Sequence, residues 1–121
     1  MRFATYDRCG LDLPAAHRYP LARYRLLREL LEAEGHAMVE PGPVSWERLA
    51  RVHDERWLAR LRDGELTERE QRAIGLPWSP RLVERSRRAV SATLAAAGDA
   101  LAHGAGMSLG GGLHHAGRAS G

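Results

Sequence analysis

Short apolar segments alternate with stretches of helical periodicity along this chain of 121 residues. Residues 2–6, 36–39 and 107–109 are the three segments with the composition of β-strands. Longer stretches with apolar residues at helical spacing lie between them. Strands that alternate with helices build a parallel sheet with helices on its faces, so the sequence predicts an α/β fold.

The predicted helices carry recognisable start and stop signals. The first follows Pro20 and ends before Gly35, and short helices are expected from Ser45 to about Arg51, over residues 55–61, and from the Thr67-Glu68-Arg69-Glu70 capping box. The longest helix has Ser79 as its N-cap, Pro80 in its first turn and Gly104 after its end. It carries an apolar stripe made of Val83, Val90, Leu94, Ala97 and Leu101.

The charge and the hydropathy of the chain bear on whether it binds nucleic acid or a membrane. The net charge is +3, but 18 basic residues are interspersed with 15 acidic ones, and only Arg85, Arg87 and Arg88 cluster. We expect this cluster to be a solvated helix face rather than a phosphate-binding patch, and so expect no nucleic-acid partner. Apolar runs are short and interrupted by charges, and the N-terminus lacks a secretory signal. With the single Cys9, these features predict a cytoplasmic protein without a membrane segment.

The segment Gly-Gly-Gly-Leu-His-His, residues 110–115, follows the third predicted strand. In open α/β sheets, ligands bind beyond the carboxyl ends of the strands. Two imidazoles there can act as acid and base near neutral pH. Adjacent side chains on extended backbone point in different directions, which suits two separate roles better than chelation of one metal. On this segment alone, a glycine-rich tail with two exposed histidines is an equally good interpretation.

Other polar and aromatic residues have a structural and a functional interpretation. His53 and Asp54 could form a catalytic dyad, but we expect Asp54 to cap the next helix. Trp78 is the tryptophan best placed to line a substrate groove, whereas Trp46 and Trp57 are expected to anchor the core. His17 is expected to brace its loop, and Cys9 has no local pattern that would activate a thiol.

Four segments in this order resemble the histone-deacetylase-like family, especially its bacterial and acetoin-utilisation-type members. They are His17-Arg18-Tyr19-Pro20, Val52-His53-Asp54 with Trp57-Leu58, Ile74-Gly75-Leu76-Pro77-Trp78-Ser79, and Gly111-Gly112-Leu113-His114-His115-Ala116. The resemblance implies the three-layer arginase/deacetylase fold and zinc-dependent hydrolysis of an acetyl-amide to an amine and acetate. The implied substrates are acetylated lysine or an acetylated small amine.

The resemblance also assigns roles to individual residues. His114 would orient and stabilise charge, and His115 would be the main general base and acid. Arg18 matches a residue near an internal acetate-exit channel. Gly111, Gly112 and Trp78 would line the route of substrate or product.

The family's zinc ligands, two Asp and one His in later motifs, have no match in this chain. We therefore expect residues 1–121 to be the N-terminal portion of a single deacetylase domain that ends before these motifs. Zinc would belong to the parent enzyme, and the chain alone would be inactive. Its third strand would form an open sheet edge that favours self-association, although the sequence specifies no oligomeric state. The alternative is a non-catalytic arginine-rich module that binds nucleic acid or a protein.

Overall fold

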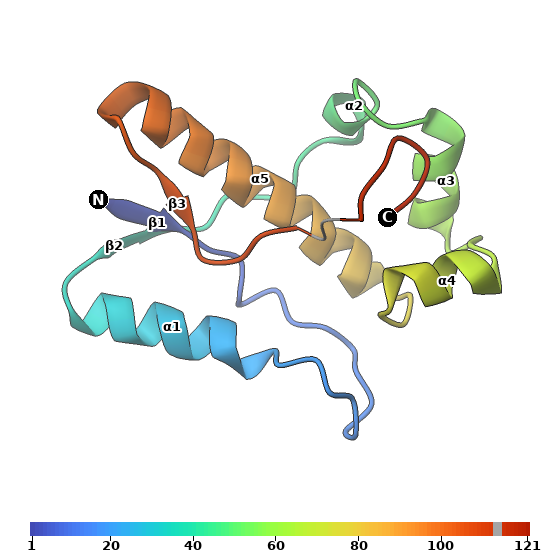
Figure 1. Cartoon of the computed structure of the whole chain (residues 1–121), viewed down its shortest axis with the longest axis horizontal. Coiled ribbons are helices and arrows are strands. Elements are labelled where there is room, and N and C mark those ends of the chain that lie inside the picture. The colour runs from blue at the N-terminus through green and yellow to red at the C-terminus, as the bar shows by residue number, and fades with distance from the viewer. Residues whose placement is uncertain (113–114) are drawn as a thin grey trace.

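The computed structural model describes residues 1–112 and 115–121. Figure 1 shows a small sheet with one helix on each side and a group of short helices at one end. In chain order the elements are β1 (Arg2–Ala4), α1 (Ala22–Ala33), β2 (Ala37–Val39), α2 (Trp46–Leu49), α3 (Glu55–Asp63), α4 (Glu68–Ile74), α5 (Pro80–His103) and β3 (Met107–Ser108). This order matches the sequence prediction element by element.

The sheet is parallel and has the strand order β2-β1-β3. Phe3 in the central strand is level with Met38 on one side and with Met107 on the other. Helices α1 and α5 lie on opposite sides of this sheet (Figure 1). The predicted α/β class, with parallel strands and flanking helices, is therefore confirmed. As predicted, β3 is an edge strand.

The helix signals in the sequence act as expected. Ser79 Oγ accepts a hydrogen bond of 3.0 Å from the backbone N–H of Leu82, and Asp54 caps α3 in the same way through Trp57. Thr67 and Glu70 form the predicted capping box. Helix α1 starts at Ala22, close to the predicted start at Pro20, and its N-cap Leu21 supplies no side-chain hydrogen bond.

Helix α5 buries a different face from its apolar stripe. Leu82, Ala89, Ala92 and Ala96 are buried, and the small alanines let the helix approach the sheet closely. Most of the stripe is exposed, most strongly Leu101 with an exposed fraction of 91%. Exposed apolar faces of this kind offer a surface for further packing.

Two apolar clusters stabilise the fold. One joins the sheet to α5 and is made of Ala4, Tyr6, Ala89 and Ala92. The other joins the short helices to one another and is made of Val44, Leu49, Trp57, Leu58 and Leu66. Trp57 is a core anchor, as predicted. None of the helices in the described part of the chain is both long and apolar enough to cross a membrane.

The expectation that Arg85, Arg87 and Arg88 form a solvated helix face is wrong. Arg85 is buried, with an exposed fraction of 5%. Arg87 donates a hydrogen bond of 2.8 Å to the carbonyl of Val44 and lies over the ring of Trp46. Arg88 pairs with Glu84 one turn earlier. Sequence proximity misled the prediction, because Arg87 lies two residues from Arg85 and so points away from it around the helix.

A buried ion pair connects the end of β1 to α1. Arg28 Nε donates to both carboxylate oxygens of Asp7, at 3.0 and 2.9 Å, and Nη1 donates to Glu32 at 2.6 Å. The side chains of Arg28 and Asp7 are only 9% and 3% exposed. Thr5 Oγ1 also donates to Asp7. The pair fixes the distance between the sheet and α1 because neither charge can be left alone in this environment.

We expect Arg28→Met to destabilise the protein by about 3 kcal/mol, because it leaves the carboxylate of Asp7 buried without a cation. The free energy of unfolding in urea measures the effect. The matched control is Arg25→Met on the same helix. Arg25 pairs with Glu29, and both side chains are about half exposed, so the loss should stay below about 1 kcal/mol. Equal losses in the two variants would contradict this account of the pair.

A second prediction concerns pH. Two hydrogen bonds of 2.7 Å from Arg60, with further ones from Thr67, lower the pKa of Glu70 to about 2. A carboxyl group whose pKa is lowered by folding stabilises the protein above its unfolded pKa, and this stabilisation is lost as pH falls through the folded pKa. Glu70→Gln should therefore destabilise the protein at neutral pH, and the difference from the wild type should vanish between pH 4.5 and about 2. Urea unfolding of both proteins across this range gives the difference directly; a constant difference would contradict the prediction.

Candidate active site at the carboxyl edge of the sheet

The glycine run starts where the central and edge strands end together. The backbone N–H of Leu109 donates to the carbonyl of Ala4 at 2.9 Å, so pairing with β1 continues one residue past β3. Gly110 is buried, whereas Gly111 and Gly112 are exposed. Tyr6, two residues beyond β1, meets the run at this edge.

Tyr6 determines the path of the glycine run. Its hydroxyl donates a hydrogen bond of 2.9 Å to the carbonyl oxygen of Gly111. A Cβ atom on Gly110 would lie only 2.6 Å from Tyr6 Oη and 3.1 Å from Tyr24 Cε1. Real Cβ contacts are not this short, so only glycine fits at this position. The aromatic rings and the glycine run are thus packed in direct contact.

A buried guanidinium supports the rings from the other side. Arg85 Cζ lies 4.8 Å from the centre of the Tyr6 ring and 5.2 Å from that of Tyr24, within cation–π range. The hydroxyls of Tyr19 and Tyr24 are 2.9 Å apart. Three aromatic rings and one cation therefore form a single cluster beneath the glycine run.

The three tyrosines of the cluster differ in pKa because their surroundings differ. Burial and the hydrogen bond to Tyr24 raise the pKa of Tyr19 to about 12. Burial also raises the pKa of Tyr6, although Arg85 opposes it. For Tyr24, burial is outweighed by hydrogen bonds from Tyr19 and Arg23, and its pKa is lowered. Tyr24 is thus the phenol whose anion the surroundings stabilise.

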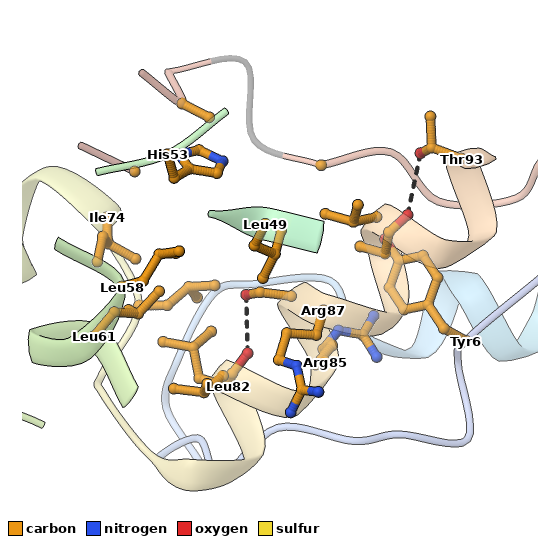
Figure 2. A pocket seen from close by; sticks show the side chains of 18 of the residues that line it. Tyr6, Leu49, His53, Leu58, Leu61, Ile74, Leu82, Arg85, Arg87 and Thr93 are labelled. Carbon is orange, nitrogen blue, oxygen red and sulfur yellow. Dashed lines mark hydrogen bonds between the residues drawn. The ribbon is translucent and has the colours of Figure 1, made fainter. Parts of the chain in front are cut away.

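A pocket of about 350 Å³ opens beside this cluster, between α5 and the short helices (Figure 2). The glycine run and residues near the C-terminal end of the chain form part of its rim. Its walls are mainly apolar, and Figure 2 shows Leu58, Leu61 and Ile74 on the side away from Tyr6 and Arg85. The lining also includes Gly111, Gly112, Ala116, Ser120, Tyr6, Tyr19, Arg85 and His53.

The last residues of the chain pack on the connection between α2 and α3. The carbonyl of Arg118 accepts a hydrogen bond of 2.9 Å from the backbone N–H of Asp54 and lies 3.3 Å from His53 Nδ1. Because the side chain of Asp54 caps α3, as predicted, it is engaged there rather than with His53. The dyad interpretation therefore receives no support from the geometry.

Only some of the predicted site residues lie at the pocket. Gly111 and Gly112 lie at the rim of the pocket with open space around them. His115 is exposed in the turn that follows the run, and His114 lies outside the described residues. Arg18 is exposed on the loop before α1. The roles proposed for these residues stay predictions.

Trp78 does not line the pocket and lies against the end of α3 instead. Its Nε1–H donates to the carbonyl of Leu61 at 2.7 Å, and its ring lies against Gly64 at the end of α3. The indole is thus part of the packing between α3 and the start of α5. Its predicted place along a substrate route is untested. The observed contacts show that the indole packs in the fold.

Sequence reasoning missed Tyr6, Tyr24 and Arg85 as members of the site. Arg85 could have been found, because Leu82, Ala89 and Ala92 share its helix face at spacings of three and four residues. An arginine on a face of small apolar residues is a candidate buried cation. Tyr6 carries no comparable signal, because its role depends on strand pairing.

Among residues 1–112 and 115–121, no group of three or more His, Cys, Asp or Glu side chains could hold a metal ion. The lone Cys9 is partly buried, and burial raises the pKa of its thiol, which disfavours a nucleophilic role. The described residues therefore do not fit a zinc site. What they provide is a shaped backbone edge beside a pocket.

We expect Gly110→Ala to cost about 1–3 kcal/mol of stability, because the new methyl group overpacks against Tyr6 and Tyr24. Gly112→Ala is the matched control, since a Cβ at this position meets nothing within 4 Å. Thermal unfolding and the near-ultraviolet circular dichroism of the tyrosines report both effects. If the two variants behaved alike, the contact between Gly110 and the rings would not have the importance assigned to it.

Comparisons with known proteins identify the family of this chain. The family model described as histone deacetylase domain matches residues 15–121, which include the α5 helix and the glycine run. An uncharacterized protein of Picosynechococcus sp. is 38% identical over 112 residues, which cover 86% of this chain and 36% of that protein. The chain thus spans about a third of the length of this curated relative. On the extent of the family match, the chain belongs to the histone deacetylase family.

Proposed function

We propose that this chain is the N-terminal portion of a zinc-dependent deacetylase domain. The whole domain would hydrolyse the acetyl-amide of acetylated lysine, or of an acetylated small amine, to an amine and acetate. The 121 residues would supply one half of the active site, and the remainder of the domain would supply the other half.

The observation that carries the proposal is the position of the glycine run. It leaves the sheet at the carboxyl edge, where ligands bind in open α/β folds, and Tyr6 holds it there by the hydrogen bond to Gly111. His114 and His115 follow directly in the sequence, within the family match. The edge strand β3 is open on its outer side among the described residues, so further strands can add next to the site.

In this proposal the two histidines have different roles. His115 takes a proton from the attacking water and returns it to the leaving amine, as a general base and then a general acid. His114 orients the reacting groups and stabilises their charge. Zinc would need ligands from outside the described residues, which offer no suitable group. We therefore propose that the chain alone is inactive.

The alternative, an arginine-rich module that binds nucleic acid, has less support. Its basis was the basic cluster on α5, but Arg85 is buried and Arg87 is bound to the carbonyl of Val44 and stacked on Trp46. Little of this charge is available to phosphates, which bind arginine and lysine groups on an accessible surface.

The first experiment assays zinc-dependent hydrolysis of an acetyl-lysine peptide by the purified 121-residue chain. We expect no activity above that of the buffer with zinc. Activity that is lost with a chelator would contradict the proposal that the metal ligands lie elsewhere.

The second experiment joins this chain to the part of the Picosynechococcus protein that lies beyond the match. We expect this chimera to bind zinc and to hydrolyse the acetyl-lysine peptide. His115→Ala should lower its kcat by about 10²–10⁴-fold without loss of zinc, because a general base contributes that factor. Arg88→Gln, which removes only the pair with Glu84 on the outside of α5, serves as the folding control. A folded, zinc-loaded chimera that hydrolyses no acetyl-amide would contradict the proposed function.

A further inference from the structure

The outer face of α1 is apolar although it points away from the sheet. Arg28 is buried against Asp7 and marks the side of the helix that is turned to the sheet. Leu26 and Leu30 lie two residues before and after Arg28, so they point to the opposite side, with exposed fractions of 56% and 58%. Leu27 beside them is 40% exposed. A surface helix carries polar residues on this side, so the leucines mark a face that a partner would bury.

Further chain of the same domain is poorly placed to be that partner. Figure 1 shows α1 on one side of the sheet and α5 on the other. Additional strands would extend the sheet beyond its edge strands β2 or β3, and the helices that cover them would lie beside α1 and α5 in the same layers. The far side of α1 would stay at the surface of such a three-layer domain. The partner is therefore expected to be another molecule.

The order of charges along α1 fits a second, antiparallel copy of the same helix. Residues 23–34 read Arg-Tyr-Arg-Leu-Leu-Arg-Glu-Leu-Leu-Glu-Ala-Glu. When the segment is turned end to end, every arginine lies opposite a glutamate and every leucine opposite a leucine. The facing pairs are Arg23 with Glu34, Arg25 with Glu32, Arg28 with Glu29, Leu26 with Leu31, and Leu27 with Leu30. A two-fold axis at the midpoint makes the helix complementary to itself, as an isologous interface requires.

The terminal charge pair lies on the outer face together with the leucines. Arg23, Leu27, Leu30 and Glu34 follow one another at spacings of four, three and four residues, which places them on one stripe of the helix. Arg23 is exposed and donates a hydrogen bond to the hydroxyl of Tyr24. The side chain of Glu34 is 60% exposed. Both charges are thus accessible to a partner.

The helix dipole favours the same orientation. The N-terminal end of α1 is basic and its C-terminal end is acidic; its first turn has no acidic residue and its last turn has no basic one. This order is the reverse of the one that stabilises a single helix, whose N-terminus favours anions and whose C-terminus favours cations. In an antiparallel pair, the acidic end of each helix lies beside the positive N-terminus of the other. Association therefore makes the charge order favourable.

We propose that α1 is a homodimerisation surface on which two copies of this chain pack antiparallel about a two-fold axis. Leu27 of each copy contacts Leu30 of the other, and Arg23 of each copy forms an ion pair with Glu34 of the other. The contact is limited to a helix of 12 residues. We therefore expect a weak dimer, with a dissociation constant on the order of 10–100 μM. The proposal uses neither zinc nor the two histidines and is independent of the deacetylase function.

Sedimentation velocity of the full 121-residue chain, at concentrations that bracket this dissociation constant, tests the surface. We expect a reversible monomer–dimer equilibrium. Leu30→Ser removes a leucine from both halves of the contact and should raise the dissociation constant at least about tenfold. Leu101→Ser on α5 is the matched control, because Leu101 is 91% exposed and lies outside α1; it should leave the dissociation constant unchanged.

A chain that stays monomeric at all these concentrations would overturn the proposal. Association that Leu30→Ser leaves unchanged, or that Leu101→Ser weakens equally, would place the contact elsewhere, such as at the open edge of β3, and would also overturn it.

Charge reversal tests the antiparallel register. Arg23→Glu places two glutamates opposite each other at both ends of the contact, and Glu34→Arg places two arginines there, so each single variant should dimerise at least about tenfold more weakly. The double variant restores opposite charges and should dimerise like the wild type, as should an equimolar mixture of the two single variants. Both substitutions suit the helix dipole, and circular dichroism establishes that α1 is retained. A double variant as weak as the single ones would overturn the register.

The chimera with the Picosynechococcus protein distinguishes a second copy from further chain of the domain as the occupant of this face. We expect the folded chimera to dimerise and to respond to Leu30→Ser as the 121-residue chain does. A folded chimera that is monomeric at the same concentrations would show that the remainder of the domain covers α1, and would overturn the proposal.

Discussion

The contact between Tyr6 and the glycine run is the interaction on which the site depends. Tyr6 follows the central strand, and its hydroxyl holds the carbonyl of Gly111 while its ring leaves no space for a side chain at Gly110. Arg85 packs on the ring from α5. One aromatic side chain therefore couples the sheet, the longest helix and the segment that leads to His114 and His115. A packed contact of this kind transmits position because cores deform little.

Two surfaces of the structure are open to further packing. Its sheet has three short strands with β3 at an edge, and α5 exposes Val90, Leu94 and Leu101. The match to about a third of a longer relative agrees with both observations.

Much of the fold could be predicted from local signals, and much of the site could not. Ser79, Thr67 and Asp54 each cap a helix through their own side chains, so the sequence at one position decides the structure nearby. The buried face of α5 could not be chosen from its apolar stripe, because alanines pack on the sheet and larger residues stay exposed. Tyr6 and Gly111 meet across 105 positions, and such a contact exists only after strand pairing. The family resemblance singled out His114 and His115 as candidates but gave no sign of the cluster of Tyr6, Tyr24 and Arg85.

The backbone dynamics of the glycine run give the most direct measurement of this account. In ¹⁵N relaxation experiments, the amide of Gly111 in the wild-type chain should have an order parameter of about 0.85, typical of rigid backbone. Tyr6→Phe removes only the hydroxyl that bonds to Gly111, and the order parameter should then fall below about 0.6, as in flexible segments. A run that is equally rigid with and without this hydroxyl would contradict the claim that Tyr6 positions the glycine run.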